Sequence, residues 1–188
     1  PTRASIMTGK YPVRLGTTDY FGAPQPNNVH KHWTRNKPLL PASFKEYLPL
    51  EEVTIAEALN HNGYQTFFAG KWHLGEWLPE HLPMGQGFEH QYGHYAWGID
   101  YYTKTIVHNA PARFAVYDWH RNQQPLQENG YATDLFAAEA ERVIARQRKD
   151  RPFFLYVPFN AVHGPINRVP RYTDRYDARS AALKCLDD

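Results

Sequence analysis

The chain has 188 residues, 42% of them hydrophobic, and a formal net charge of +2. That apolar content is enough for a sizeable core and excludes a disordered chain. No basic block suggests a nucleic acid or an anionic membrane as partner, and no apolar run reaches the roughly 20 residues of a membrane span. The single cysteine, Cys185, excludes an internal disulfide and an internal cysteine-rich metal site.

Pro1 fits the first turn of a helix at the start of the sequence. Arg3 then lies in the first helical turn, where unpaired backbone N–H groups and the helix dipole favour anions. A positive charge at this point suits an anionic reacting group. The alternative is an ordinary helix start with a surface arginine.

Thr54 and Glu57 have the spacing of a capping box, which predicts a helix from Thr54 that stops at Gly63. Residues 64–69 are rich in aromatics and predict a strand. Lys71 and His73 follow it and, two residues apart in an extended chain, should point to the same side. Ligands of α/β sheets bind where strands end, so this pair is a candidate site, although a solvated lysine and a structural histidine are the alternative.

Residues 76–131 have no sustained hydrophobic period and are predicted to form a long, pocket-forming excursion, with a short strand at 101–107. His90 and His94 are four residues apart, but no helix or third ligand supports a metal site there. We predict no metal ligands in this chain.

A second helix is predicted over 132–149, with Thr133 as its cap, followed by a strand at 153–157 whose apolar run is typical of burial on both faces. Two helix–strand units predict an α/β fold with a mostly parallel sheet and helices on both faces. His163 follows the second strand and is a further candidate. Residues 174–188 are predicted to be helical, with Asp187 and Asp188 on a solvated face.

Three motifs in this order resemble the signatures of the formylglycine-dependent sulfatase family, an alkaline-phosphatase-like fold. Pro1-Thr-Arg-Ala-Ser-Ile-Met-Thr-Gly-Lys10 is similar to the first signature from its third position onward. Gly63-Tyr-Gln-Thr-Phe-Phe-Ala-Gly-Lys-Trp-His-Leu-Gly75 is similar to the second. Val162-His-Gly-Pro165 is similar to a third element. The chain is identified as a member of this family, as part of a single catalytic domain spanning 1–188.

The resemblance implies how the site works. The nucleophile would be the hydrate of a formylglycine, made by a maturation enzyme from a Cys or Ser two residues before Pro1. Arg3 would stabilise it, and His73 would hydrogen bond or deprotonate its hydroxyl. Lys71 and His163 would bind the sulfate and assist the leaving oxygen. The family also implies Ca²⁺, with ligands outside these residues, so we expect an internal fragment that is inactive by itself and has unpaired sheet edges.

The resemblance also implies a substrate and a compartment. Asp100-Tyr101-Tyr102 resembles a segment near the substrate pocket in the arylsulfatase and N-acetylgalactosamine-4-sulfatase branch. A sulfated sugar or an aryl sulfate is therefore expected, in a periplasmic, secreted or lysosomal enzyme. Two alternatives stay open. A phosphodiesterase or phosphonate hydrolase of the same superfamily would have Thr two residues before Pro1, and a non-catalytic binder of sulfated sugars would have Ala or Gly there.

Overall fold

A computed structural model describes residues 1–31, 35–106, 115–165, 167 and 169. Its centre is the strand β1 (Gln65–Lys71), in which every residue is buried. β1 pairs in parallel with β2 (His90–His94) on one side and with β5 (Phe153–Tyr156) on the other. A hairpin of β3 (His120–Arg121) and β4 (Gln124–Pro125) extends the sheet beyond β2 in antiparallel pairing. The sheet order is β4-β3-β2-β1-β5.

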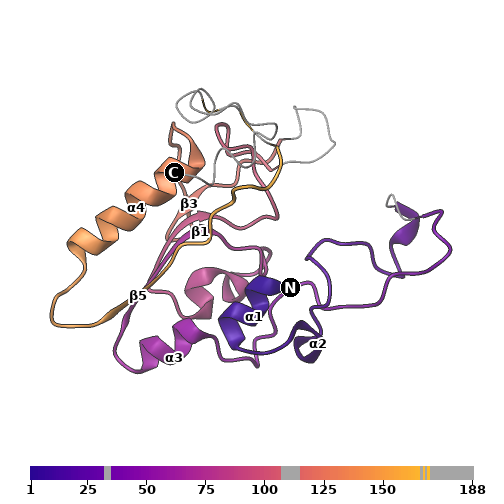
Figure 1. Cartoon of the computed structure of the whole chain (residues 1–188), viewed down its shortest axis with the longest axis horizontal. Coiled ribbons are helices and arrows are strands. Elements are labelled where there is room, and N and C mark those ends of the chain that lie inside the picture. Colours follow the sequence, from indigo (N-terminus) through magenta and orange to yellow (C-terminus); the bar gives the residue numbers. More distant parts are fainter. Residues whose placement is uncertain (32–34, 107–114, 166, 168, 170–188) are drawn as a thin grey trace, which may run out of the picture.

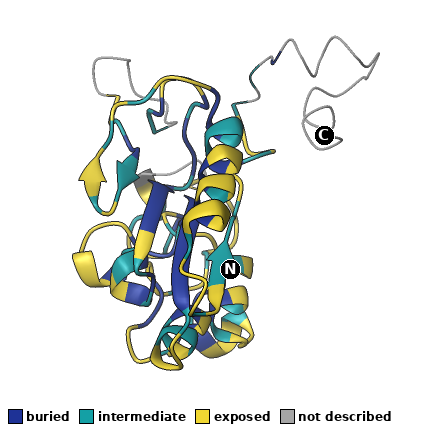
Figure 2. Ribbon diagram, turned by 90° about the vertical axis from the view of Figure 1, so that its left-hand side faces the viewer, coloured by how far each residue is buried: buried dark blue, intermediate teal, exposed yellow. Residues whose placement is uncertain are grey.

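Helices cover both faces of this sheet (Figure 1). Phe68 points to the face that packs against α1 (Thr2–Thr8) and α3 (Ile55–His61). The next residue, Ala69, points to the opposite face, where Phe136 of α4 (Ala132–Arg146) packs. Figure 2 shows the buried strands between helices whose outer surfaces are exposed. The predicted α/β fold is confirmed, with the correction that the two antiparallel pairings make the sheet mixed.

The remaining helical segments are short and lie in the connections. They are α2 (Pro12–Leu15) and the 3₁₀ turns η1 (Val29–Lys31), η2 (Pro79–His81) and η3 (Pro83–Gln86). Among the described residues, no helix has the length and apolar character needed to cross a membrane.

The predicted capping box at the start of α3 is confirmed. The Thr54 hydroxyl accepts from the backbone N–H of Glu57 at 3.0 Å, and the Glu57 carboxylate accepts from the N–H of Thr54 at 2.7 Å. The two bonds satisfy N–H groups that a helix start otherwise leaves unpaired. Gly63 follows the helix end with φ +85°, a conformation that glycine adopts without steric cost.

The cap predicted for α4 was wrong, although the helix exists. Tyr131, with extended backbone angles, is the N-cap, and Thr133 lies inside the first turn. The reason is tertiary: the Tyr131 ring stacks on Tyr101, and the N–H of Ala132 donates to the carbonyl of Tyr101 at 2.9 Å. The helix also ends at Arg146, earlier than expected.

The predicted burial of the 153–157 strand on both faces was also wrong. Phe153 is 37% exposed and the rest of β5 is only half-buried. β5 is the last strand of the described sheet, so its only strand neighbour there is β1. In contrast, β1 lies between two strands and has helices on both faces. Position in the sheet, and not apolar content, decided which strand was enclosed.

The 76–131 segment contains a core strand, β2, that the sequence did not predict. β2 is His-Gln-Tyr-Gly-His, and its polar side chains are almost all buried. The strand predicted at 101–107 was wrong: Tyr101–Thr103 form a turn, and only isolated bridges join Ile99 to Ile106 and Thr105 to Tyr117. Val107, the helix predicted at 174–188, Cys185, Asp187 and Asp188 lie outside the described residues.

Gly70 lets β1 lie close to both of its neighbours near the end of the strand. A Cβ built on Gly70 would lie 2.3 Å from the carbonyl oxygen of Pro158, and one on its register partner Gly93 would lie 2.1 Å from the Gly70 carbonyl oxygen. Any larger residue would push the strands apart here. The following residue, Lys71, is thereby held between β2 and the segment after β5.

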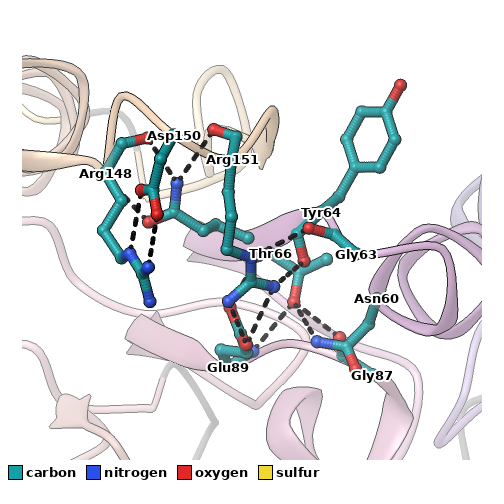
Figure 3. A network of polar contacts seen from close by, with 10 residues as sticks. Asn60, Gly63, Tyr64, Thr66, Gly87, Glu89, Arg148, Asp150 and Arg151 are labelled. Atoms are coloured by element: carbon teal, nitrogen blue, oxygen red, sulfur yellow. Dashed lines mark hydrogen bonds and ion pairs between the residues drawn. The ribbon is translucent and has the colours of Figure 1, made fainter.

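The opposite, amino-terminal ends of the three parallel strands are joined by a polar network (Figure 3). Arg151, just before β5, donates from Nε to the Gly63 carbonyl at 2.9 Å and from Nη2 to the Tyr64 carbonyl at 2.8 Å, and it lies 3.5 Å from Glu89. Thr66 of β1 donates to the carbonyl of Gly87 at 2.8 Å. The network fixes the register of β1, β2 and β5 before they reach the site.

We predict that Arg151→Ala lowers the free energy of unfolding by about 1–3 kcal/mol, because the hydrogen bonds from its charged guanidinium to the carbonyls of Gly63 and Tyr64 are lost. The matched control is Arg148→Ala, whose ion pair with Asp150 is 63% exposed on both side chains and should contribute little to stability. Urea denaturation of both variants measures the difference. Equal losses would show that the Arg151 network does not fix the strands.

Candidate active site

Arg3 is held at the carboxyl-terminal end of β1 by the short helix α1. Ala4 and Met7 of this helix are fully buried and anchor it to the core. The guanidinium donates from Nε to the carbonyl of Lys71 at 3.2 Å and from Nη2 to the carbonyl of Phe159 at 3.3 Å. Arg3 therefore connects the ends of β1 and β5, and it keeps its positive charge there because guanidinium groups do not deprotonate in proteins.

Lys71 is the last residue of β1 and is only 5% exposed. Burial, and to a lesser extent the nearby positive charge of Arg3, lowers the pKa of its ammonium to about 7. Among the described residues, no carboxylate forms an ion pair with Lys71 or Arg3. Two cations that are desolvated together without a counter-ion favour the binding of an anion.

His73 follows two residues later, but not in extended chain. Its φ is +53°, in the left-handed region, so the prediction that an extended backbone aligns it with Lys71 was wrong. Its Nε2 lies 3.0 Å from the carbonyl oxygen of Phe21, which can only accept, so Nε2 carries the proton and Nδ1 is an acceptor with no donor among the described residues. Burial lowers the pKa of His73 to about 4, and the charges of Lys71 and Arg3 act in the same direction. The imidazole is neutral at pH 7 and able to accept a proton.

His163 lies on the loop after β5. Its backbone N–H donates to the carbonyl of Asn160 at 2.9 Å, and its Nδ1 lies 2.7 Å from the carbonyl of Gly164. The side chain is exposed. No hydrogen bond or ion pair among the described residues joins His163 to the other three candidates, so the structure brings Arg3, Lys71 and His73 into one group and places His163 on the adjoining loop at the same end of the sheet.

The sequence did not single out the buried pair of His94 and Asp118. His94, fully buried, is the register partner of Lys71 and packs on the Phe136 ring. Its Nδ1 lies 4.0 Å from Asp118, and burial lowers its pKa to about 3. Asp118 accepts from the N–H of Ala96 at 2.7 Å, and it holds the chain just after β2. The sequence suggests His94 only as a partner of His90, and Asp118 lies in no motif, so no sequence signal pairs the two.

The described residues do not fit a Ca²⁺ site. No group of three His, Cys, Asp or Glu side chains among them is arranged to hold a metal ion. Arg3 and Lys71, which lie together at the end of β1, are cations and cannot serve as metal ligands. His90 and His94 also fail as a pair, because four positions along a strand span about 13 Å.

These features define an α/β protein that holds two cations, without a carboxylate partner among the described residues, and a neutral histidine at the carboxyl end of a parallel strand. The family model "Sulfatase" matches residues 1–185. The chain belongs to the sulfatase family, whose members are sulfuric ester hydrolases.

Known relatives agree with this assignment. Arylsulfatase J of Mus musculus is 30% identical in an alignment that covers all of this chain and 30% of that protein. N-acetylgalactosamine-6-sulfatase of Homo sapiens is 32% identical in an alignment that covers 88% of this chain and 30% of that protein. The solved structure of Ps i-CgsB in complex with k-i-k-neocarrahexaose superposes with a TM-score of 0.74 and 25% identity, over all of this chain and 41% of that one. The chain thus spans about 30% of the length of these two curated relatives.

We predict that acid destabilises the protein through His94. Its pKa is about 3 in the folded state and about 6.5 when unfolded, so below pH 6.5 the unfolded state binds a proton that the folded state does not. His94→Leu should reduce the slope of unfolding free energy against pH between 6 and 4 by about 1.4 kcal/mol per pH unit.

Urea denaturation at several pH values measures this slope. Phe136→Leu is the control, because it disturbs the same packing without removing a titrating group and should lower stability equally at each pH. An unchanged slope in His94→Leu would contradict the assignment.

A second prediction concerns the affinity for inorganic sulfate. Lys71 must be protonated to attract the anion, and its pKa in the free site is about 7. Sulfate affinity should therefore fall by up to about tenfold per pH unit above pH 7. Lys71→Arg should remove this dependence, because arginine stays charged. Calorimetric titrations at pH 7, 8 and 9 test it, and a flat wild-type profile would contradict it.

Proposed function

We propose that the protein to which this chain belongs removes sulfate from a sulfated carbohydrate or an aryl sulfate. The observation that carries the proposal is the pair of desolvated cations, Arg3 and Lys71, without a carboxylate partner among the described residues and next to the neutral His73. A sulfate ester offers anionic oxygens to the cations and an oxygen that needs a proton.

The names of relatives support both substrate types. One similar protein is an arylsulfatase, another is an N-acetylgalactosamine-6-sulfatase, and the similar solved structure contains an oligosaccharide. The choice between them lies in the loops around the site. The prediction that residues 76–131 form the pocket belongs to this proposal, and the course of Trp97 to Tyr101 beside His163 supports it.

Each of the chain's own residues has a defined task in the proposed reaction. A formylglycine, made by a maturation enzyme from a Cys or Ser two residues before Pro1, would supply the nucleophile. Arg3 stabilises negative charge at the nucleophile, because its guanidinium is fixed by the carbonyls of Lys71 and Phe159. Lys71 binds a sulfate oxygen as a point charge.

Two histidines transfer protons in the proposed reaction. His73 has its proton on Nε2, bonded to the carbonyl of Phe21, so its Nδ1 accepts the proton of the attacking hydroxyl. His163 gives a proton to the oxygen that leaves with the alcohol. Acid–base assistance of this kind contributes about 10²- to 10⁴-fold to rate, and stabilisation of charge on the sulfuryl oxygens contributes further.

The family supports two further parts of the proposal. A sulfatase of this kind uses Ca²⁺, and we assign no step to it because the described residues do not hold it. We also propose a periplasmic, secreted or lysosomal enzyme.

We predict that His73→Ala lowers kcat for nitrophenyl sulfate by about 10²- to 10⁴-fold in the complete, formylglycine-bearing protein. His90→Ala is the control, since His90 is an exposed histidine stacked on Phe67. Circular dichroism and thermal unfolding establish that both variants fold. Undiminished turnover in His73→Ala would refute its role. A wild-type protein that cleaves a phosphodiester and no sulfate ester would refute the proposed function.

A further inference from the structure

The side chain of His163 lies against a separate segment of the chain, residues 97–101. The Trp97 ring lies edge-to-face with the imidazole, with centroids 5.5 Å apart and planes at 67°. The hydroxyl of Tyr101 donates to the backbone carbonyl of His163 at 2.9 Å. Asn160, three residues before His163, donates to the carbonyl of Ile99 at 3.4 Å. His163 is thus fixed by contacts distant in sequence and not by its own loop alone.

Gly98 provides the space that the imidazole occupies. A Cβ built on Gly98 would lie 3.0 Å from Cε1 of His163 and 2.9 Å from its Nδ1, the second closer than real Cβ atoms approach. Gly98 has no left-handed φ that would itself require glycine. The absence of a side chain at this position is therefore explained by the imidazole.

The 97–101 segment is itself firmly anchored. Asp100 accepts from the N–H groups of Tyr102 at 3.0 Å and Thr103 at 2.8 Å. Tyr101 is 2% exposed and stacks on Tyr131 with centroids 5.2 Å apart. The segment is rigid enough to define the orientation of a neighbouring ring.

The contacts of Nδ1 decide which nitrogen is available. The carbonyl of Gly164 can only accept, so Nδ1 of His163 carries a proton and donates it to this carbonyl in a hydrogen bond. Nε2 makes no hydrogen bond to any described residue. It is therefore the nitrogen left to meet a substrate.

We propose that Trp97, Gly98 and Tyr101 are positioning residues that orient Nε2 of His163 toward the leaving oxygen. This inference rests on the proposed sulfatase function. As the oxygen of the nucleophile bonds to sulfur, the bond from sulfur to the leaving oxygen breaks and its electron pair stays on that oxygen. An imidazole with protons on both nitrogens gives its Nε2 proton to the leaving oxygen, and a neutral imidazole and an alcohol remain. The three residues touch His163 and act through it.

A leaving-group comparison tests the proposal in the complete, matured protein. Proton donation matters most for a basic leaving oxygen, such as that of a sugar alcohol, and little for nitrophenolate. Gly98→Ala should lower kcat for a sulfated monosaccharide by about 10²-fold and that for nitrophenyl sulfate by less than about threefold. Tyr101→Phe, which removes one hydrogen bond and keeps the ring, should give the same pattern with about a fivefold loss on the sugar sulfate.

Tyr64→Phe is the matched control, because its hydroxyl has no described partner and its ring points away from the polar network at the far end of β1 (Figure 3). It should leave both activities unchanged. Equal losses of both activities in Gly98→Ala would mean a general structural role and would overturn the inference, as would undiminished turnover of the sugar sulfate.

A second measurement does not need turnover. In ¹⁵N-histidine spectra of the complete protein, the imidazole signals of His163, assigned with His163→Asn, should shift in Gly98→Ala and in Tyr101→Phe, and stay in place in Tyr64→Phe. Unmoved His163 signals in the first two variants would overturn the positioning. A wild-type protein that cleaves neither ester would overturn the proposed function instead, so the two failures are distinguishable.

Discussion

Burial of β1 on both faces and along both edges is the constraint on which the rest of this structure depends. Its seven residues are all buried, where an unpaired backbone group is costly, so each N–H and carbonyl needs a partner in β2 or β5 or in the segments that continue them. Gly70 and Gly93 allow the close approach that this pairing requires. Arg151 and Thr66 hold the other ends of the strands in register. The strand therefore holds Lys71, its last residue, at a fixed position.

The same burial produces the chemistry of the site. Lys71 and Arg3 lose water where no described carboxylate compensates them, and the pKa of Lys71 falls toward neutrality. His73 feels both cations and stays neutral at pH 7. A site in this electrostatic state attracts an anion and holds a base ready, whereas a site with paired charges would do neither. His94, placed opposite Lys71 by the strand register, adds no negative charge that would cancel the cations.

Some features followed from local sequence because they are decided within a few residues. The capping box of Thr54 and Glu57, the helix stop at Gly63 and the strand leading to Lys71 depend on hydrogen bonds and dihedral preferences between near neighbours. Other features failed for the complementary reason. The start of α4 is set by the packing of Tyr131 on Tyr101, and the exposure of β5 is set by its place at the end of the described sheet. Neither cause is visible within a window of sequence.

By itself the sequence determined the α/β class, the family and the four candidate residues Arg3, Lys71, His73 and His163, since these depend on the residue order within three motifs. Only the tertiary structure decided that β2 joins the core and that His73 has a left-handed backbone. It also decided that His94 and Asp118 lie together beside Lys71. The contacts of Gly98 and Tyr101 with His163 likewise exist only in the folded chain. The physical reason is that charge states and ring orientations depend on neighbours brought from distant parts of the chain, and burial of those neighbours exists only in the folded protein.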